Sequence, residues 1–316
     1  MRCARCHTPL SESDRFCPQC GQKRELDPGS LHEQALQLYH RGQTEAAVAL
    51  WDDAVALDPD FSLGHYYRGL ALYDRGDLSE ALSAFRAALK GSREPFRILF
   101  KLGLAQYGLG DLAGSIDSFR RALQLNPDSA ETCYRLGLSY LRQSDLEHAR
   151  EALDGAIRLN PKYARALFIL GMVYSQQGDN DRAIELFRQV EEVSPAYTEA
   201  LFELGMALLR KGELAAAADQ FERTVANSPR FTPAQFMLAE ARRRLEDWPA
   251  AVTAYRRALT LNPRDLDGWL QLADCLRRLS RFQEAVEAVG QALALSPDHP
   301  GAKALAATLG DVGPET

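Results

Sequence analysis

The chain has 316 residues, of which 46% are hydrophobic and 25% charged, and its formal net charge is -6. This composition is ordinary for a globular protein, and the acidic balance argues against a general nucleic-acid binder, because that role needs a basic face that neutralises phosphates. No apolar run approaches the roughly 18 to 20 residues that span a bilayer. The first residues also lack the apolar segment of a secretory signal. We therefore expect a cytoplasmic protein without membrane insertion.

Four of the six cysteines lie at the start of the chain, as two Cys-x2-Cys pairs separated by ten residues. In a reducing compartment this spacing predicts a metal site rather than two disulfides. Four thiolates from two facing turns make a tetrahedral shell that suits zinc and leaves no open position for a substrate. We predict that residues 1–26 form a structural zinc ribbon whose ligands are Cys3, Cys6, Cys17 and Cys20.

The stretch RCARCHTPLSESDRFCPQCGQ resembles the short zinc ribbons at the starts of many bacterial proteins. The resemblance implies that Phe16 is the apolar plug of the module. A segment this small cannot build a sufficient core, so we expect it to fold only with its metal.

Residues 28–299 divide into eight blocks of 34 residues without an insertion. Position 8 of each block is Gly or Ala and position 20 is Ala or Ser, which allows two helices to cross closely. Position 15 is mostly Gly, which permits a left-handed turn, and position 32 is Pro in all blocks except one, which ends a helix. Apolar residues at positions 4, 7, 8 and 11 and at 20, 24 and 27 lie on single helix faces. Each block is therefore predicted to be a helix hairpin.

This pattern resembles the tetratricopeptide repeat. The resemblance implies an all-α protein, a right-handed superhelical solenoid of eight hairpins whose first helices line a concave groove. One hairpin cannot bury its apolar face, whereas stacked hairpins share a continuous core. We assign residues 27–316 to this solenoid, with the segment after residue 299 as a C-terminal capping helix.

Two blocks depart from the pattern. The second has Arg93 in place of the proline that stops the second helix. The seventh has Arg242 at core position 11, Glu246 at the turn and Pro249 at the start of its second helix. We expect a bend after the second block and weaker stacking in the seventh.

Positions 5, 9 and 12 follow an i, i+4, i+7 spacing and form one stripe on each first helix. The resemblance implies that this stripe faces the groove. Aromatic residues at positions 5 and 12 are common in such repeats and also pack between hairpins, but position 9 is Leu or Met in the first six blocks. An apolar patch of this size marks an interaction surface, and Leu and Met suit an apolar helix or extended peptide. The predicted partner-binding residues are Tyr66, Leu70, Tyr73, Phe100, Leu104, Tyr107, Tyr134, Leu138, Phe168, Met172, Phe202, Met206, Phe236, Arg243 and Arg277.

The sequence has no metal-protease, nucleophile or phosphate-loop motif, and Cys133 and Cys275 fall on helical positions expected to be buried. We predict a non-catalytic protein-protein interaction scaffold or adaptor whose only cofactor is structural zinc. An alternative is a nucleic-acid-associated regulator that uses the ribbon for contact, since residues 1–26 carry five Arg or Lys against three Asp or Glu. Self-association through the apolar stripe is also open.

Overall fold

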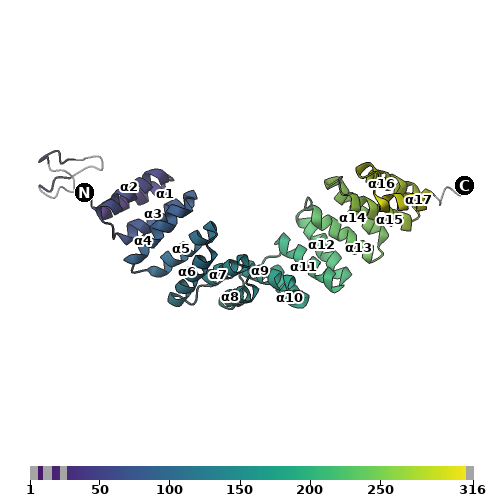
Figure 1. Cartoon of the computed structure of the whole chain (residues 1–316), viewed down its shortest axis with the longest axis horizontal. Coiled ribbons are helices and arrows are strands. Elements are labelled where there is room, and N and C mark those ends of the chain that lie inside the picture. Colours follow the sequence, from purple (N-terminus) through teal and green to yellow (C-terminus); the bar gives the residue numbers. More distant parts are fainter. Residues whose placement is uncertain (1–5, 10–15, 22–26, 311–316) are drawn as a thin grey trace. The chain divides into compact units, whose positions relative to one another are not determined.

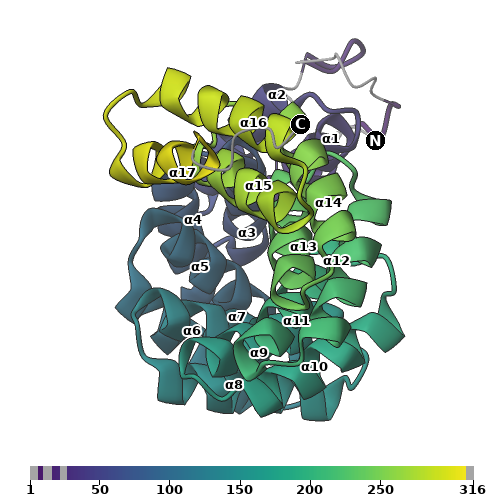
Figure 2. The same cartoon turned by 90° about the vertical axis from the view of Figure 1, so that its right-hand side faces the viewer.

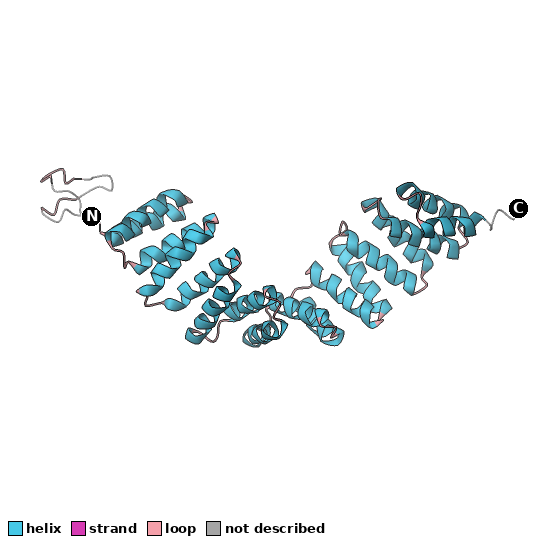
Figure 3. Cartoon of the chain, in the orientation of Figure 1, coloured by secondary structure: helices cyan, strands magenta, loops and turns pink. Residues whose placement is uncertain are grey.

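The computed structural model describes residues 6–9, 16–21 and 27–310; residues 28–310 are α-helices joined by short loops, and the described ranges contain no strand (Figure 3). The chain divides into two compact units, residues 1–159 and 160–316. The prediction of an all-α repeat fold is confirmed.

The first unit contains four helix hairpins (Figure 1). Each helix packs against the next along the chain, and the first helices of successive hairpins also touch one another. The pairs are α1 (Pro28–His40) with α2 (Thr44–Leu57), α3 (Ser62–Arg75) with α4 (Leu78–Lys90), α5 (Pro95–Leu109) with α6 (Leu112–Leu125), and α7 (Ala130–Arg142) with α8 (Leu146–Leu159).

The second unit contains four further hairpins and one more helix, which Figure 2 shows in green and yellow. The pairs are α9 (Ala164–Gln176) with α10 (Asn180–Val193), α11 (Thr198–Lys211) with α12 (Leu214–Asn227), α13 (Thr232–Arg244) with α14 (Trp248–Leu261), and α15 (Leu266–Arg278) with α16 (Phe282–Leu295). The last helix, α17 (Pro300–Gly310), packs against α15 and α16, as a capping helix does. Residues 311–316 lie outside the described part of the chain.

The glycine at position 8 makes room for the large side chain at position 24 of the same hairpin. A Cβ on Gly171 would lie 2.6 Å from the ring of Phe187, and a Cβ on Gly103 would lie 2.7 Å from the ring of Phe119. Both rings are fully buried. The close helix crossing predicted from the small residues is therefore confirmed, and a larger residue at position 8 would force the helices apart.

The residue at position 15 adopts a left-handed conformation in all eight hairpins, with φ between 59° and 93°. This includes Ser144, Glu246 and Ser280, which are not glycine and so carry some backbone strain. The predicted turn is thus confirmed, and Glu246 makes the same turn as the glycines.

The seventh hairpin is regular despite its unusual sequence. Pro249 lies in the first turn of α14, where proline is well tolerated because no backbone donor is lost. The guanidinium of Arg242 lies 2.6 Å from a carboxylate oxygen of Glu222 and 3.6 Å from one of Asp247, at the edge of the core. Nε of Arg242, however, is buried without a hydrogen-bond partner. The expectation of weaker stacking stays a prediction.

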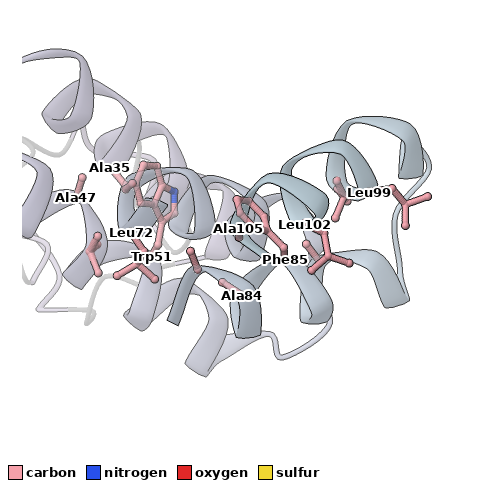
Figure 4. Close-up of a cluster of buried hydrophobic side chains, with 14 of the residues drawn as sticks. Ala35, Ala47, Trp51, Leu72, Ala84, Phe85, Leu99, Leu102 and Ala105 are labelled. Carbon is pink, nitrogen blue, oxygen red and sulfur yellow. The ribbon is translucent and has the colours of Figure 1, made fainter. Parts of the chain in front are cut away.

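The core of the first unit lies between the two helix layers. Figure 4 shows Trp51 and Phe85, both fully buried, among small and aliphatic side chains of neighbouring helices. Large rings alternate with alanine in this core, so that neighbouring helices can approach closely. The thiols of Cys133 and Cys275 are buried as predicted.

Candidate functional site

Three of the four predicted metal ligands lie together. The sulfur atoms of Cys6, Cys17 and Cys20 are all within 4.8 Å of one another, and those of Cys6 and Cys17 are 3.4 Å apart. Cys3 lies outside the described residues. Three thiols converging from two separate turns match the donor set that binds a soft, tetrahedral ion such as zinc.

The surroundings of Cys6 favour its thiolate form. Its sulfur lies 3.1 Å from the hydroxyl of Thr8, and hydrogen bonds from Thr8 lower the pKa of Cys6 to about 6. A thiolate is the form that coordinates a metal.

The side chain of Phe16 is 58% exposed. The prediction that it forms the apolar core of the zinc ribbon is therefore wrong.

In the first unit, the predicted stripe is a half-buried surface on α3, α5 and α7. The rings of Tyr66 and Phe100 pack against Phe85 and Phe119, with centroids 6.1 and 5.8 Å apart, whereas Tyr134 is buried. The other predicted residues of this unit are half-buried, and they are Leu70, Tyr73, Leu104, Tyr107 and Leu138.

In the second unit, the position 5 rings are held from two sides. Phe168 lies between Phe187 and Tyr197, at centroid distances of 5.9 and 5.0 Å. Its repeat equivalent Phe202 lies between two rings in the same way. These rings therefore contribute to hairpin packing and present only part of their surface to solvent.

Met172, at position 9, is the most exposed of the predicted apolar stripe residues. Met172 is 36% exposed, whereas Met206 at position 9 and Phe236 at position 5 are half-buried. Met172 has no role in the helix crossing, because Gly171 and Phe187 already form it. The helix crossing therefore does not require Met172.

The charged residues at the end of the stripe are paired within their own helices. The guanidinium of Arg243 donates to both carboxylate oxygens of Glu240 at 2.8 and 2.9 Å, and that of Arg277 donates to Asp274 at 2.6 and 3.2 Å. The bond to Glu240 raises the pKa of Arg243. The i, i+3 spacing of these residues was the sequence signal for this pairing.

Sequence reasoning missed the aromatic residues at position 34, the last of each block. Tyr197 covers Phe168, and Phe231 covers Phe202, each with a centroid distance of 5.0 Å. The recurrence of a ring at the end of several blocks was visible, but only the structure shows that it lies on the position 5 ring of the same block.

Helix hairpins that recur every 34 residues and bury their faces only against their neighbours define an α-helical repeat protein. The tetratricopeptide repeat model matches residues 32–94, 73–130, 134–193, 171–230 and 236–300, and the chain therefore belongs to the tetratricopeptide repeat family. Residues 2–23 match a zinc-ribbon domain. Helical repeats of this kind present extended surfaces to other proteins, so the chain is a protein-interaction scaffold by class.

Solved structures agree with this assignment. The chain is 28% identical to MamA over 53% of its own length and 92% of MamA, with a TM-score of 0.51. It is 15% identical to the C-terminal part of a TPR repeat-containing protein from Cytophaga hutchinsonii, covering 75% of this chain and 98% of that one, with a TM-score of 0.65. It is 22% identical to YrrB, described as a TPR protein with an unusual peptide-binding site, covering 55% and 90%, with a TM-score of 0.51.

The comparison with curated proteins gave no match. Across residues 6–9, 16–21 and 27–310, no helix combines the length and the apolar character needed to cross a membrane.

Proposed function

We propose that this scaffold acts in the cytoplasm as an adaptor that binds an apolar helix or extended segment of a partner protein. The binding surface is the stripe at positions 5, 9 and 12 of the first helices. The observation that carries the proposal is the exposure of Met172 in the second unit, together with the half-buried Met206 at position 9 of the following hairpin.

The two parts of the stripe have different roles in this proposal. The rings of Phe168 and Phe202 build a firm base, because each is fixed between two other rings. Met172 and Met206 lie one helical turn further along and supply the adjustable contact. Methionine suits this role because its flexible, polarisable side chain adapts to the shape of a partner.

At position 9 the stripe is apolar in the first six hairpins and charged in the last two, and this change indicates which part of the stripe contacts the apolar segment of the partner. In the last two hairpins position 9 is Glu240 or Asp274, and each carboxylate is paired with an arginine on its own helix. A partner contact there must compete with these pairs, so the apolar part of the segment is expected to lie on the earlier hairpins. YrrB shows that this fold holds a peptide in at least one protein.

We further propose that Cys3, Cys6, Cys17 and Cys20 hold one structural zinc ion. The three described thiols fit this ion, since they converge and the hydrogen bonds from Thr8 stabilise the thiolate of Cys6. A fully ligated zinc supplies folding free energy rather than chemistry. The proposed module covers residues 1–26, and the eight repeats cover residues 28–299.

The proposal is tested by quantitative capture of proteins from a lysate of the source cells. The full chain is compared with a Met172→Asn, Met206→Asn variant, which makes the stripe polar without touching the rings. Val193→Asn is the matched control, because Val193 is equally exposed at 37% but lies at the end of a second helix. The double variant should lose partners that the wild type and the control retain; equal recovery by all three proteins contradicts the proposal.

Two other outcomes have their own tests. A band shift of short DNA or RNA at low salt, abolished by removing residues 1–26, would support the nucleic-acid alternative. A molecular mass that doubles with concentration and returns to the monomer value in the Met172→Asn, Met206→Asn variant would identify a second copy of the chain as the occupant of the stripe.

A further inference from the structure

The second hairpin has an open pocket where other hairpins have an aromatic ring. The pocket has a volume of about 740 Å³ and lies between the loop that joins α2 to α3 and the loop that joins α4 to α5. The rings of Phe61, Tyr66 and Tyr67 form its apolar wall, and Gly91 and Arg93 lie on the opposite loop. This volume is within the range of small-ligand sites.

The repeat symmetry shows what normally fills this place. In the fifth and sixth hairpins the ring at position 34 lies on the ring at position 5, as Tyr197 does on Phe168 and Phe231 does on Phe202. In the first hairpin Phe61 lies against His32 in the same way, at a centroid distance of 5.9 Å.

In the second hairpin position 34 is Pro95, so the ring that lies on the position 5 ring in the fifth and sixth hairpins is absent from this position. The Tyr66 ring lies 5.3 Å from the ring of Tyr67 and 6.1 Å from that of Phe85, and it also lines the pocket.

A second difference between this block and the others enlarges the same pocket. Position 30 is leucine in most blocks but glycine at residue 91. Gly91 has a φ of -120°, which any residue adopts, and a Cβ built on it would meet only the carbonyl oxygen of Asp60 at 3.6 Å and the Cβ of Ser62 at 3.9 Å. These are ordinary contacts, so neither backbone conformation nor crowding requires glycine here. Both neighbouring residues line the pocket, and the missing side chain leaves that space open.

The charges at the rim do not select a charged ligand. The lining includes Arg93 and Arg97 together with Asp58, Asp60 and Glu94, and Arg97 lies 3.8 Å from Glu94. Two arginines against three carboxylates leave only a small net charge, and the apolar part of the lining consists mainly of the three rings. Pairs of aromatic rings are more stable than the area they bury alone would give, which favours an aromatic side chain over an aliphatic one of similar size.

We propose that this pocket binds an aromatic side chain of a partner protein, which lies against Tyr66 as Tyr197 lies against Phe168. The inference rests on the proposed function in one respect: the aromatic side chain is taken to belong to a partner protein. The pocket adjoins the stripe through Tyr66 and gives the partner a distinct anchor: an aromatic residue at the edge of the second hairpin.

The test uses the full chain and N-acetyl-4-fluorophenylalanine amide as the probe, with binding followed by fluorine NMR. Pro95→Tyr places a ring at position 34 and should fill the pocket from within, and Gly91→Leu should fill it from the opposite loop. Ser129→Tyr adds the same ring at position 34 of the next hairpin and is the matched control. We expect both filled variants to bind the probe at least about tenfold more weakly than the wild type and the control, a difference of about 1.4 kcal/mol.

N-acetyl-leucine amide should compete poorly with the probe. Equal affinity in the wild type and in both filled variants, equal competition by the leucine compound, or no binding of the probe to the wild type would each overturn the inference. The Met172→Asn, Met206→Asn variant should bind the probe normally, so failure here is distinguishable from failure of the proposed stripe.

Discussion

The indole nitrogen of Trp51 donates a hydrogen bond of 3.0 Å to Nδ1 of His32, and both side chains are buried in the first hairpin. His32 is the position 5 residue of the first block and so belongs to the stripe that was expected to face the groove. The structure turns it inward, because it is the acceptor that a buried indole needs. The acceptor nitrogen must be unprotonated, so the other ring nitrogen carries the hydrogen.

The His32 contact predicts a loss of stability in mild acid. Burial lowers the pKa of His32, and the nearby charge of Glu33 opposes this only in part. The unfolded chain therefore takes up the proton first as the pH falls. The contribution of His32 to the free energy of unfolding is complete above about pH 6.5 and falls below it, by at most about 1.4 kcal/mol per pH unit.

Denaturant unfolding of the first hairpins between pH 7.5 and 5 measures this effect. A His32→Gln variant keeps an acceptor but does not titrate, so its stability should change less over that range. Identical pH dependence in His32→Gln and wild type would refute the assignment.

The close helix crossing predicts that a larger residue at position 8 destabilises the hairpin. Gly171→Val places carbon atoms within 3 Å of the Phe187 ring and should cost about 1 to 3 kcal/mol. The additional change Phe187→Leu should recover part of this loss. As a control, Gly290 in α16 has nothing within 4 Å of its Cβ position, so Gly290→Ala should stabilise by about 0.5 to 1 kcal/mol through helix propensity. Thermal unfolding of the variants checks the opposite signs.

The left-handed turns predict that glycine would improve the seventh hairpin. Glu246 has a φ of 60°, a conformation that costs a non-glycine residue about 1 to 2 kcal/mol. Glu246→Gly should therefore stabilise α13 and α14 by about 0.5 to 1 kcal/mol after the entropy cost of glycine. Slower amide hydrogen exchange in these two helices is the readout. The reverse change, Gly178→Glu, should speed amide hydrogen exchange in α9 and α10. Unchanged exchange in both variants would contradict the claim that a non-glycine residue at position 15 carries backbone strain.

The helix hairpins could be predicted from the 34-residue period, because each recurring position has a physical cause within its own hairpin. The small residue at position 8 is explained by the ring at position 24, and the glycine at position 15 by its positive φ. The contacts that the sequence analysis missed are those that depend on the direction in which a side chain points. The cover of Tyr197 on Phe168 and the partner of His32 depend on side-chain directions that a spacing of apolar residues does not encode.

The cysteine cluster predicts one bound zinc ion that the repeats do not need. Cys17→Ser should abolish zinc binding, measured by metal analysis after gel filtration, because a hydroxyl is a poor ligand for this ion. Cys133→Ser, which changes a buried thiol of α7, should keep the metal. Chelation should leave the helical circular dichroism of residues 27–310 almost unchanged. Retention of zinc by Cys17→Ser would contradict the site.

The binding surface is tested most directly by replacing Met172 with a photo-crosslinking amino acid in living cells, with the same replacement at Val193 as the control. The two positions are equally exposed in the same unit but only Met172 lies on the stripe. The account predicts a crosslink from position 172 to an apolar segment of one partner, identified by mass spectrometry and absent at position 193. The same products at both positions, or a crosslinked segment rich in charged residues, would contradict it.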